Sequence, residues 1–272
     1  MPSERAKIAR NPWIKERTVG RSKCNLQLWR ESKDPTELAI AFAHNFVEIW
    51  DARDNSCVYS IQCEERCILY SARFFGNNRE DLVLASGTVF NQVLLWNVMQ
   101  ESEHDLGVVR RKFIGHEGVI FGVRFSENGR YIVSVSDDRT IRLWNADADD
   151  DMKPLVLYGH IARVWDCLIL NDYLVSISED SSCRVWKNSF YNNSKDDLSD
   201  VDCIACWEGH VGKNVWSLAV NTSQKIVATG GGDSGIRLWS LATITNNKIG
   251  AVDVNLVPPS LEKHDANHHW YL

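Results

Sequence analysis

Residues 115–144, GHEGVIFGVRFSENGRYIVSVSDDRTIRLW, decide the fold of this 272-residue chain. Within them, segments 131–136 and 140–144 are rich in β-branched and aromatic residues, a composition that predicts two β-strands. The acidic pair between these segments predicts the tight turn of a hairpin. Together with segments 119–126 before the hairpin and 153–158 after it, the pattern predicts one four-stranded unit.

The ending of this stretch recurs along the chain, and self-similarity at a fixed period indicates a repeat architecture. Five segments end alike on a tryptophan, and these tryptophans stand 46, 48, 42 and 53 residues apart. That interval is close to the roughly 40–45 residues of one β-propeller blade, with the surplus placed in loops. The five residues are Trp50, Trp96, Trp144, Trp186 and Trp239.

Three of the repeats share further positions ahead of the tryptophan. A Gly-His pair places its histidine 26 to 29 residues before it, a hydroxyl residue lies ten before it, and an aspartate lies six before it. Such regular spacing predicts one structural motif built three times. The sets are His116, Ser134, Asp138 and Trp144; His160, Ser176, Asp180 and Trp186; and His210, Thr229, Asp233 and Trp239.

These motifs resemble those of the WD-repeat family. The resemblance implies a buried chain of hydrogen bonds in which the aspartate accepts from the histidine, the histidine meets the hydroxyl, and the hydroxyl reaches the indole N–H. Each neutral link contributes on the order of 1 kcal/mol, whereas an orphaned buried partner costs about 1–3 kcal/mol. A hydrolase triad is the alternative interpretation, but three copies at strand and turn positions favour architecture over one active site.

We therefore predict an all-β fold, a WD-repeat β-propeller with four full four-stranded blades and a partial one. We expect the propeller to be incomplete, because WD-repeat propellers most often use seven blades. The predicted organisation is a basic, poorly ordered N-terminal segment at 1–33, propeller blades at 34–245 and a C-terminal tail at 246–272.

The first two repeats depart from the motif. Ahead of Trp96 the aspartate position holds Phe90 while Ser86 keeps the hydroxyl position, and the matching positions ahead of Trp50 hold His44 and Ile40. We expect packing alone to hold these two blades. The first blade also has no evident inner strand, unless residues 26–29 supply it.

Charge and cysteine content narrow the class of protein. The net charge is −6, yet residues 1–33 carry +6, so the remaining residues carry about −12. A basic arm could touch RNA or an acidic partner, although a solvated tail is the simpler interpretation. Eight cysteines without a signal peptide favour a reducing, cytosolic or nuclear compartment, and no apolar run is long enough for a membrane span.

Several stretches are similar to one family within the WD-repeat proteins, the WD repeat-containing protein 6 family. They are residues 43–45, 91–96, 118–121, 162–165, 173–176 and 233–239, and the resemblance runs from about residue 37 to 241. Two features depart from that family: residues 1–33 do not match the start of its propeller, and its members are several-fold longer.

The resemblance implies a cytoplasmic, non-catalytic accessory subunit for 2′-O-ribose methylation of the tRNA anticodon wobble nucleotide. Such a subunit docks a separate tRNA ribose methyltransferase and helps to present the tRNA, so it needs no cofactor or small-molecule substrate. A general protein-interaction adaptor in a signalling or ubiquitin-ligase complex is the alternative.

Aligning the segments after each Gly-His pair gives candidate partner-binding residues. Phe121, Trp165 and Trp216 fall at one equivalent position, where WD-repeat strands begin near the central channel. They could anchor a protein partner or stack on the bases of a single-stranded loop, or they could simply fill space between blades. Arg163 and Lys213, just before two of them, could contact phosphates or form a solvated rim.

For three further patterns we favour a structural interpretation over a functional one. The glycine-rich run 230–235 lacks the lysine and helix of a phosphate-binding loop and sits at a turn position. Cys203 and Cys206 have zinc-ligand spacing without a second pair, and strand alternation explains them. His264, His268 and His269 cluster in the predicted C-terminal tail. We predict no metal site.

Overall fold

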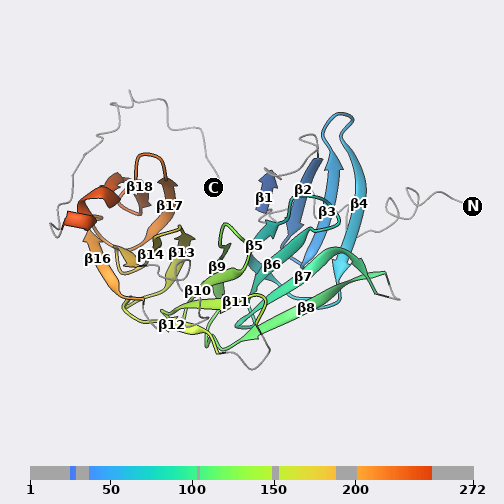
Figure 1. The fold of residues 1–272 in the computed structure, drawn as a ribbon, viewed down its shortest axis with the longest axis horizontal. Helices are drawn as coiled ribbons and strands as arrows, with labels where there is room; N and C mark the ends of the chain where they lie inside the picture. The colour runs from blue at the N-terminus through green and yellow to red at the C-terminus, as the bar shows by residue number, and fades with distance from the viewer. Residues whose placement is uncertain (1–24, 29–36, 103–104, 149–152, 188–200, 247–272) are drawn as a thin grey trace, which may run out of the picture.

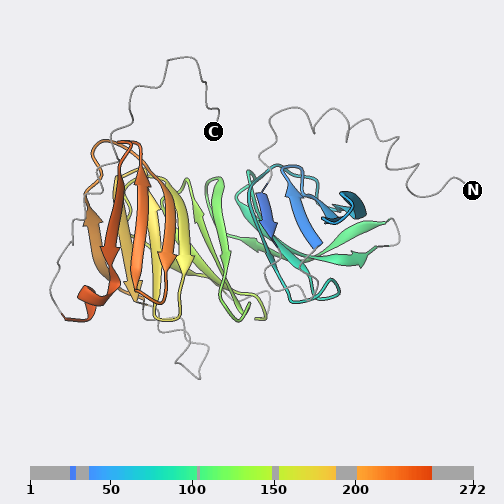
Figure 2. The same ribbon diagram turned by 90° about the horizontal axis from the view of Figure 1, so that it is seen from above.

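A computed structural model describes residues 25–28, 37–102, 105–148, 153–187 and 201–246. These residues form β-sheets arranged in an open arc, and the first strand of each sheet lies on the inner side of the arc (Figure 1). Figure 2 shows the first and last sheets at opposite ends of the molecule. This arrangement confirms the predicted all-β propeller fold.

Within the described residues there are five blades, and the strands of each blade are consecutive in the sequence. Blade 1 holds β1 (Asn25–Leu28), β2 (Glu37–Phe42), β3 (Phe46–Asp51) and β4 (Ser56–Cys63). Blade 2 holds β5 (Leu69–Phe75), β6 (Val83–Thr88), β7 (Gln92–Glu101) and β8 (Leu106–Ile114). Blade 3 holds β9 (Ile120–Phe125), β10 (Tyr131–Ser136), β11 (Ile141–Asn145) and β12 (Leu155–Leu157). Blade 4 holds β13 (Val164–Ile169), β14 (Tyr173–Ser178), β15 (Ser182–Lys187) and β16 (Cys203–Glu208).

Blade 5 is the partial blade. It holds β17 (Val215–Asn221), β18 (Ile226–Gly231) and β19 (Ile236–Ser240), and the chain then continues into the 3₁₀ helix η1 (Leu241–Asn246) instead of a fourth strand. The sequence pattern had cast doubt on blade 1, but β1 pairs antiparallel with β2 and supplies its inner strand. This strand lies inside the segment predicted to be poorly ordered, whereas residues 1–24 and 247–272 lie outside the described residues.

The hairpin turn between the second and third strands has one geometry in every blade. A single non-glycine residue in it adopts a left-handed conformation, with φ between 58° and 69°. In blade 3, Asp138 stabilises this turn because its carboxylate accepts the backbone N–H of Thr140 at 2.9 Å. The five left-handed residues are Asn45, Asn91, Arg139, Ser181 and Ser234.

Adjacent blades pack through one repeated pair of faces. We call the side of a blade that carries the repeat tryptophan its tryptophan face, and the other side its opposite face. In the core between blades 3 and 4, Ile141 and Leu143 from the opposite face of blade 3 pack with Leu174 and Trp186 from the tryptophan face of blade 4. The other three cores between neighbouring blades have the same composition by position.

Blades 1 and 2 are also joined at their outer edges. Strand β4 pairs in parallel with β8, so their eight strands form one continuous sheet. Gly107 lies at this junction, where a Cβ atom would come within 2.4 Å of the Trp96 ring. The junction therefore requires glycine at this position.

Leu174 and Leu38 occupy the same repeat position, each opposite its own repeat tryptophan. Leu174 is fully buried between two blades, whereas Leu38 on blade 1 is only half-buried. We expect Leu174→Ala to lower the free energy of unfolding by about 2–5 kcal/mol, because it leaves a cavity. Leu38→Ala should cost clearly less in the same urea titration, and equal losses would contradict this packing scheme.

Candidate partner-binding surface

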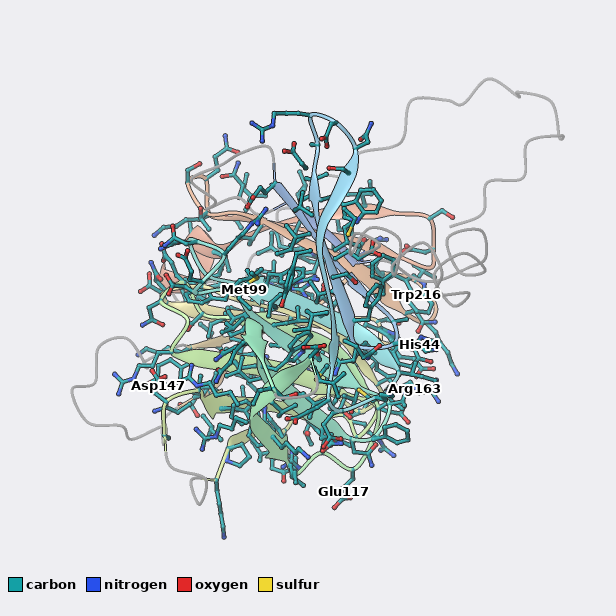
Figure 3. All side chains as sticks on the ribbon, turned by 90° about the vertical axis from the view of Figure 1, so that its right-hand side faces the viewer. His44, Met99, Glu117, Asp147, Arg163 and Trp216 are labelled. Carbon is teal, nitrogen blue, oxygen red and sulfur yellow. The ribbon has the colours of Figure 1, made fainter. Side chains whose placement is uncertain are left out.

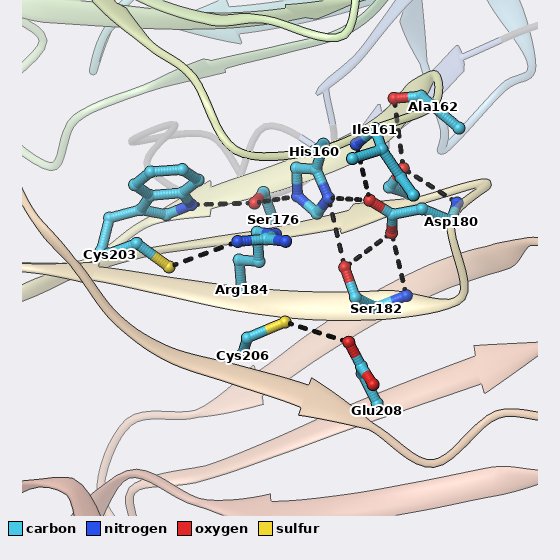
Figure 4. Close-up of polar contacts among 12 residues, drawn as sticks. His160, Ile161, Ala162, Ser176, Asp180, Ser182, Arg184, Cys203, Cys206 and Glu208 are labelled. Carbon is cyan, nitrogen blue, oxygen red and sulfur yellow. Dashed lines mark hydrogen bonds and ion pairs between the residues drawn. The ribbon is translucent and has the colours of Figure 1, made fainter.

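The four motif residues of each complete repeat form one hydrogen-bonded chain. In blade 4, Trp186 Nε1 donates to Ser176 Oγ at 2.9 Å, and Ser176 Oγ lies 2.8 Å from His160 Nε2. His160 Nδ1 lies 2.9 Å from Asp180 Oδ2, and the hydroxyl of Ser182 donates to the other carboxylate oxygen at 2.6 Å (Figure 4). Blade 3 repeats the chain with His116, Ser134, Asp138 and Trp144 at 2.7–2.8 Å.

The direction of the chain fixes the state of the histidine. An indole N–H can only donate, so the Ser176 hydroxyl accepts from Trp186 and is free to donate onward to His160 Nε2. A nitrogen that accepts carries no proton, which leaves the imidazole proton on Nδ1, facing the Asp180 carboxylate. Every link is then satisfied by a neutral histidine and an ionised aspartate.

Burial and hydrogen bonding shift the pKa values in the direction that this chain requires. Burial lowers the pKa of His116 and of His160 and outweighs the nearby carboxylates, which act to raise them. Burial acts to raise the pKa of Asp138 and Asp180, but hydrogen bonds from the histidine, a hydroxyl and a backbone N–H hold both well below their usual range. The carboxylates therefore stay ionised and the imidazoles neutral near pH 7.

Blade 5 keeps the chain with one replacement. His210 lies 2.9 Å from both Asp233 and Thr229, and Trp239 donates to Thr229 at 2.9 Å. Gly235 occupies the position at which the other two blades have the hydroxyl of Thr140 or Ser182. Arg237 donates to Asp233 at 2.8 Å. The guanidinium thus bonds to the carboxylate in place of the hydroxyl, but at Oδ2, whereas the hydroxyls of the other two blades bond to Oδ1.

The prediction that packing alone holds the first two blades is wrong. In blade 1, Trp50 Nε1 donates at 2.7 Å to Glu48, a buried carboxyl group whose pKa is raised by its burial. In blade 2, Ser86 accepts from Trp96 at 3.3 Å and donates at 2.9 Å to Asn45, which reaches over from the turn of blade 1. Glu48 and Asn45 stand at positions that are not part of the repeat motif, so the motif spacing did not predict their roles as acceptors.

Each aspartate also ties the loop before the inner strand to the hairpin turn. Its carboxylate accepts the backbone N–H of the residue that follows the histidine, at 2.9–3.1 Å. The candidate partner-binding aromatic residues, at the start of the inner strand, follow that residue four or five positions later. The buried chain therefore positions that part of the surface. The bonds are Glu117 to Asp138, Ile161 to Asp180 and Val211 to Asp233.

A β-bulge presents the aromatic residue at the start of each of these inner strands. In blade 4, Val164 pairs with Ser178 and Asp166 with Ile177, so Trp165 is the extra residue between two successive pairs. An extra residue is left out of the ladder, and its side chain is aimed away from the regular alternation. The same offset occurs at Tyr70, Phe121 and Trp216.

These four aromatic side chains form one row across blades 2 to 5, which we call the aromatic row. Ring centroids are 5.3 Å apart between Tyr70 and Phe121, 4.7 Å between Phe121 and Trp165, and 4.9 Å between Trp165 and Trp216. The two inner members are half-buried, whereas Tyr70 is 45% exposed and Trp216 is 54% exposed. The row thus combines contacts between blades with apolar surface open to a partner.

The sequence prediction missed Tyr70. It follows inward-facing Leu69 as Phe121 follows Ile120, and this local pattern was the available signal. No Gly-His pair precedes Tyr70, so an alignment on those pairs passes over blade 2.

The two predicted basic residues have different environments. Arg163 Nε lies 2.5 Å from Asp137 and 3.7 Å from Glu179, so its charge is already matched by the neighbouring turns. Lys213 is exposed. Figure 3 shows Arg163 and Trp216 on one side of the molecule and Asp147 on the other.

The structure places two of the remaining motifs in strands and turns. Residues 230–235 form the end of β18 and the turn into β19, and Cys203 and Cys206 lie in the outer strand β16. Within the described part of the chain, no group of three or more His, Cys, Asp or Glu side chains could hold a metal ion. In that same part, no helix is long and apolar enough to cross a membrane. His264, His268 and His269 lie outside the described residues.

Removing the central hydroxyl of a chain tests its energetic role. Ser134→Ala leaves the Trp144 N–H and His116 Nε2 unpaired in a buried site, and each orphaned group costs about 1–3 kcal/mol of unfolding free energy. Ser217→Ala on the exposed side of β17 is the matched control and should stay within about 0.5 kcal/mol of the parent in urea denaturation. A similar small effect at Ser134 would contradict the network.

The pKa directions predict loss of stability in acid. Because the pKa values of His116 and His160 lie below the ordinary 6.5, their protonation favours the unfolded chain as pH falls below about that value. Asp138 and Asp180, also lowered, add a second loss as pH falls below their ordinary 3.8. Thermal unfolding across pH 3–8 should show both losses, and His116→Gln should make the slope between pH 5 and 7 shallower.

Comparison with known proteins identifies the family to which these repeats belong. The family described as WD domain, G-beta repeat matches residues 107–145, 153–187 and 201–240. Each match begins at or beside the outer strand of one blade and ends in the third strand of the next, so every sequence repeat links two blades.

Several known proteins are similar in sequence to most of this chain. The tRNA (34-2'-O)-methyltransferase regulator WDR6 of Bos taurus is 33% identical over 203 residues, which cover 72% of this chain and 17% of the relative. The protein of that name in Mus musculus is 31% identical over 229 residues, covering 82% and 19%, and that in Homo sapiens is 31% identical over 203 residues, covering 72% and 17%. The chain thus spans less than a fifth of these relatives' length. It belongs to the WD-repeat proteins and, within them, to the WD repeat-containing protein 6 family that its motifs resemble.

Proposed function

We propose that this chain is a non-catalytic regulatory scaffold for 2′-O-ribose methylation of the tRNA wobble nucleotide. On this proposal it docks a separate methyltransferase in the cytoplasm. The observation that carries the proposal is the relatedness to proteins named as regulators of that methyltransferase over 72–82% of the chain. The seven described cysteines form no disulfide with one another, which supports a reducing compartment.

The state of the imidazole, hydroxyl and carboxylate groups supports a scaffold over an enzyme. A catalytic serine needs an accessible oxygen and a histidine that can take its proton. Ser134 and Ser176 are fully buried, and each oxygen already accepts from a tryptophan. Because the chain recurs in three blades with every group paired, its role is structural.

The aromatic row is the surface that we assign to the protein partner. Further apolar side chains are exposed in the turns and loops that adjoin the inner strands or connect the second and third strands, among them Phe90, Ile161 and Val211. Soluble monomers rarely expose such patches unless they bind something. Trp216 and Tyr70, at the two ends of the row, are the residues most available to anchor a partner.

Contact with tRNA is the weaker part of the proposal. Phosphate binding relies on unpaired Lys and Arg side chains and weakens steeply with salt. Arg163 is matched by Asp137 and Glu179, which leaves Lys213 as the predicted basic residue most open to phosphate. We therefore expect the methyltransferase to provide most of the affinity of the complex for tRNA.

The test is rescue of wobble methylation in cells depleted of the endogenous protein. We expect this chain to restore the modification and to co-purify with the methyltransferase. Tyr70→Ala combined with Trp216→Ala should weaken methyltransferase binding at least tenfold, because each removes an exposed aromatic anchor. Val58→Ala, an exposed apolar residue on β4, is the control and should bind as the parent does. Recovery of signalling or ubiquitin-ligase proteins alone, with methylation unrestored, would favour the general adaptor instead.

A further inference from the structure

Two arginines occupy equivalent positions on neighbouring inner strands, on the inner side of the arc (Figure 1). Arg73 lies on β5 and Arg124 on β9, and each stands four residues after the buried residue that precedes the bulge of its strand. In both side chains Nη1 donates to the backbone carbonyl of the preceding residue, at 2.9 Å for Arg73 and 3.0 Å for Arg124. The chain therefore holds the two guanidinium groups in the same way.

Arg124 has a carboxylate partner on the next blade. Its Nη2 donates at 2.5 Å to Oδ2 of Asp166, which is the first residue after the bulge of β13. The other oxygen of Asp166 accepts the backbone N–H of Cys167 at 2.8 Å. Both side chains of the pair are largely buried. The contact thus joins an arginine of one blade to the residue after the bulge of the next blade.

Arg73 has no such partner. The first residue after the bulge of β9 is Gly122, so blade 3 offers no side chain at the position that Asp166 fills in blade 4. A Cβ atom on Gly122 would come within 2.8 Å of the Val135 side chain, so a carboxylate that belongs to β9 itself would clash there. Among the described residues, Arg73 forms no ion pair and hydrogen-bonds only to the Ala72 carbonyl.

The surroundings of Arg73 make an unpaired charge unfavourable. The side chain is half-buried, and burial together with the charge of Arg124 lowers the pKa of Arg73 to about 10. Asp166 acts to raise this pKa, but its carboxylate is already bonded to Arg124. Two guanidinium groups and one carboxylate leave one positive charge in excess where water is partly excluded, and a second carboxylate would neutralise it.

We propose that Arg73 anchors a binding site for one carboxylate group, supplied by an aspartate or glutamate side chain of a protein partner that reaches the inner side of the arc between blades 2 and 3. The pair of Arg124 and Asp166 is the model for this contact within the chain, because its arginine holds a single carboxylate from the same position. Nε and Nη2 of Arg73 are the nitrogen donors that remain, and a guanidinium binds a carboxylate through two parallel hydrogen bonds.

The position of the site within the fold supports this assignment. Blades 2 and 3 both have four described strands and a described neighbour on each side, so the site does not depend on the ends of the arc. A carboxylate fits better than the larger phosphate group of RNA, since one carboxylate fills the equivalent position in blade 4. The inference does not rest on the proposed role in methylation.

The stability of the purified full chain separates a binding role of Arg73 from a structural one. Arg73→Met removes an unpaired charge and keeps most of the aliphatic stem, so the midpoint of urea unfolding should stay the same or rise. Arg124→Met leaves the buried carboxylate of Asp166 without its partner and should clearly lower the midpoint. A loss at Arg73 as large as the loss at Arg124 would overturn the inference, because Arg73 would then be part of the structure.

Binding is tested with a blocked glycine–glutamate–glycine peptide as the probe and its glutamine counterpart as the control. We expect the glutamate peptide to shift the Nε–H signal of Arg73 in ¹⁵N NMR with saturation, and to raise Tm by about 1–2 °C at twice its Kd. The glutamine peptide should do neither. Arg73→Met should lose the rise in Tm, whereas Arg66→Met, which removes an exposed arginine, should keep it.

The same titrations name the results that contradict the proposal. A glutamate peptide that gives no saturable shift at Arg73 would overturn it, as would a glutamine peptide that gives the same shift. Inorganic phosphate that shifts Arg73 at a lower concentration than the glutamate peptide, at equal ionic strength, would make this a phosphate site instead. A rise in Tm that survives Arg73→Met would place the bound carboxylate elsewhere on the molecule.

Discussion

The structure depends on one constraint: a large indole must be buried between two sheets while its N–H keeps a hydrogen-bond acceptor. In blades 3 and 4 a hydroxyl supplies the acceptor and passes the bond through a neutral histidine to an ionised aspartate, and in blade 5 Thr229 supplies the same acceptor. In blade 2 a serine–asparagine pair meets the same need, and in blade 1 a glutamate accepts from Trp50, which is only half-buried. The residues differ because the requirement is on the bond rather than on the chemical group that makes it.

The same chain links the core to the surface. Its aspartate holds both the hairpin turn and the loop that leads to the inner strand, so the start of that strand has little freedom to move. A β-bulge there turns one aromatic side chain per blade out of the sheet, and four of them meet in a row. In blades 3 to 5 the surface assigned to a partner is thus built next to a loop that the buried chain holds, which is a favourable basis for a preorganised site.

Sequence reasoning predicted the features that repeat and missed those that do not. The spacing of His116, Ser134, Asp138 and Trp144 was sufficient to predict the blades, because each position is defined relative to its tryptophan. The roles of Glu48 and Asn45 were not predicted, because one bond joins residues two apart in a single strand and the other joins two blades, and the motif of the later repeats has neither contact. The partial blade was also misplaced, because the short strand β1 is a weak signal in the sequence. Only sheet pairing shows that blade 5 has three strands among the described residues.

The most direct test of the buried chain is the protonation state of its histidines, observed by NMR of the chain labelled with ¹⁵N-histidine at pH 7. The geometry predicts neutral rings for His116 and His160, with the proton on Nδ1 and an unprotonated, accepting Nε2. Nitrogen shifts of an imidazolium, or of the tautomer protonated on Nε2, would contradict this account, because the serine would then have no acceptor for its proton within the chain.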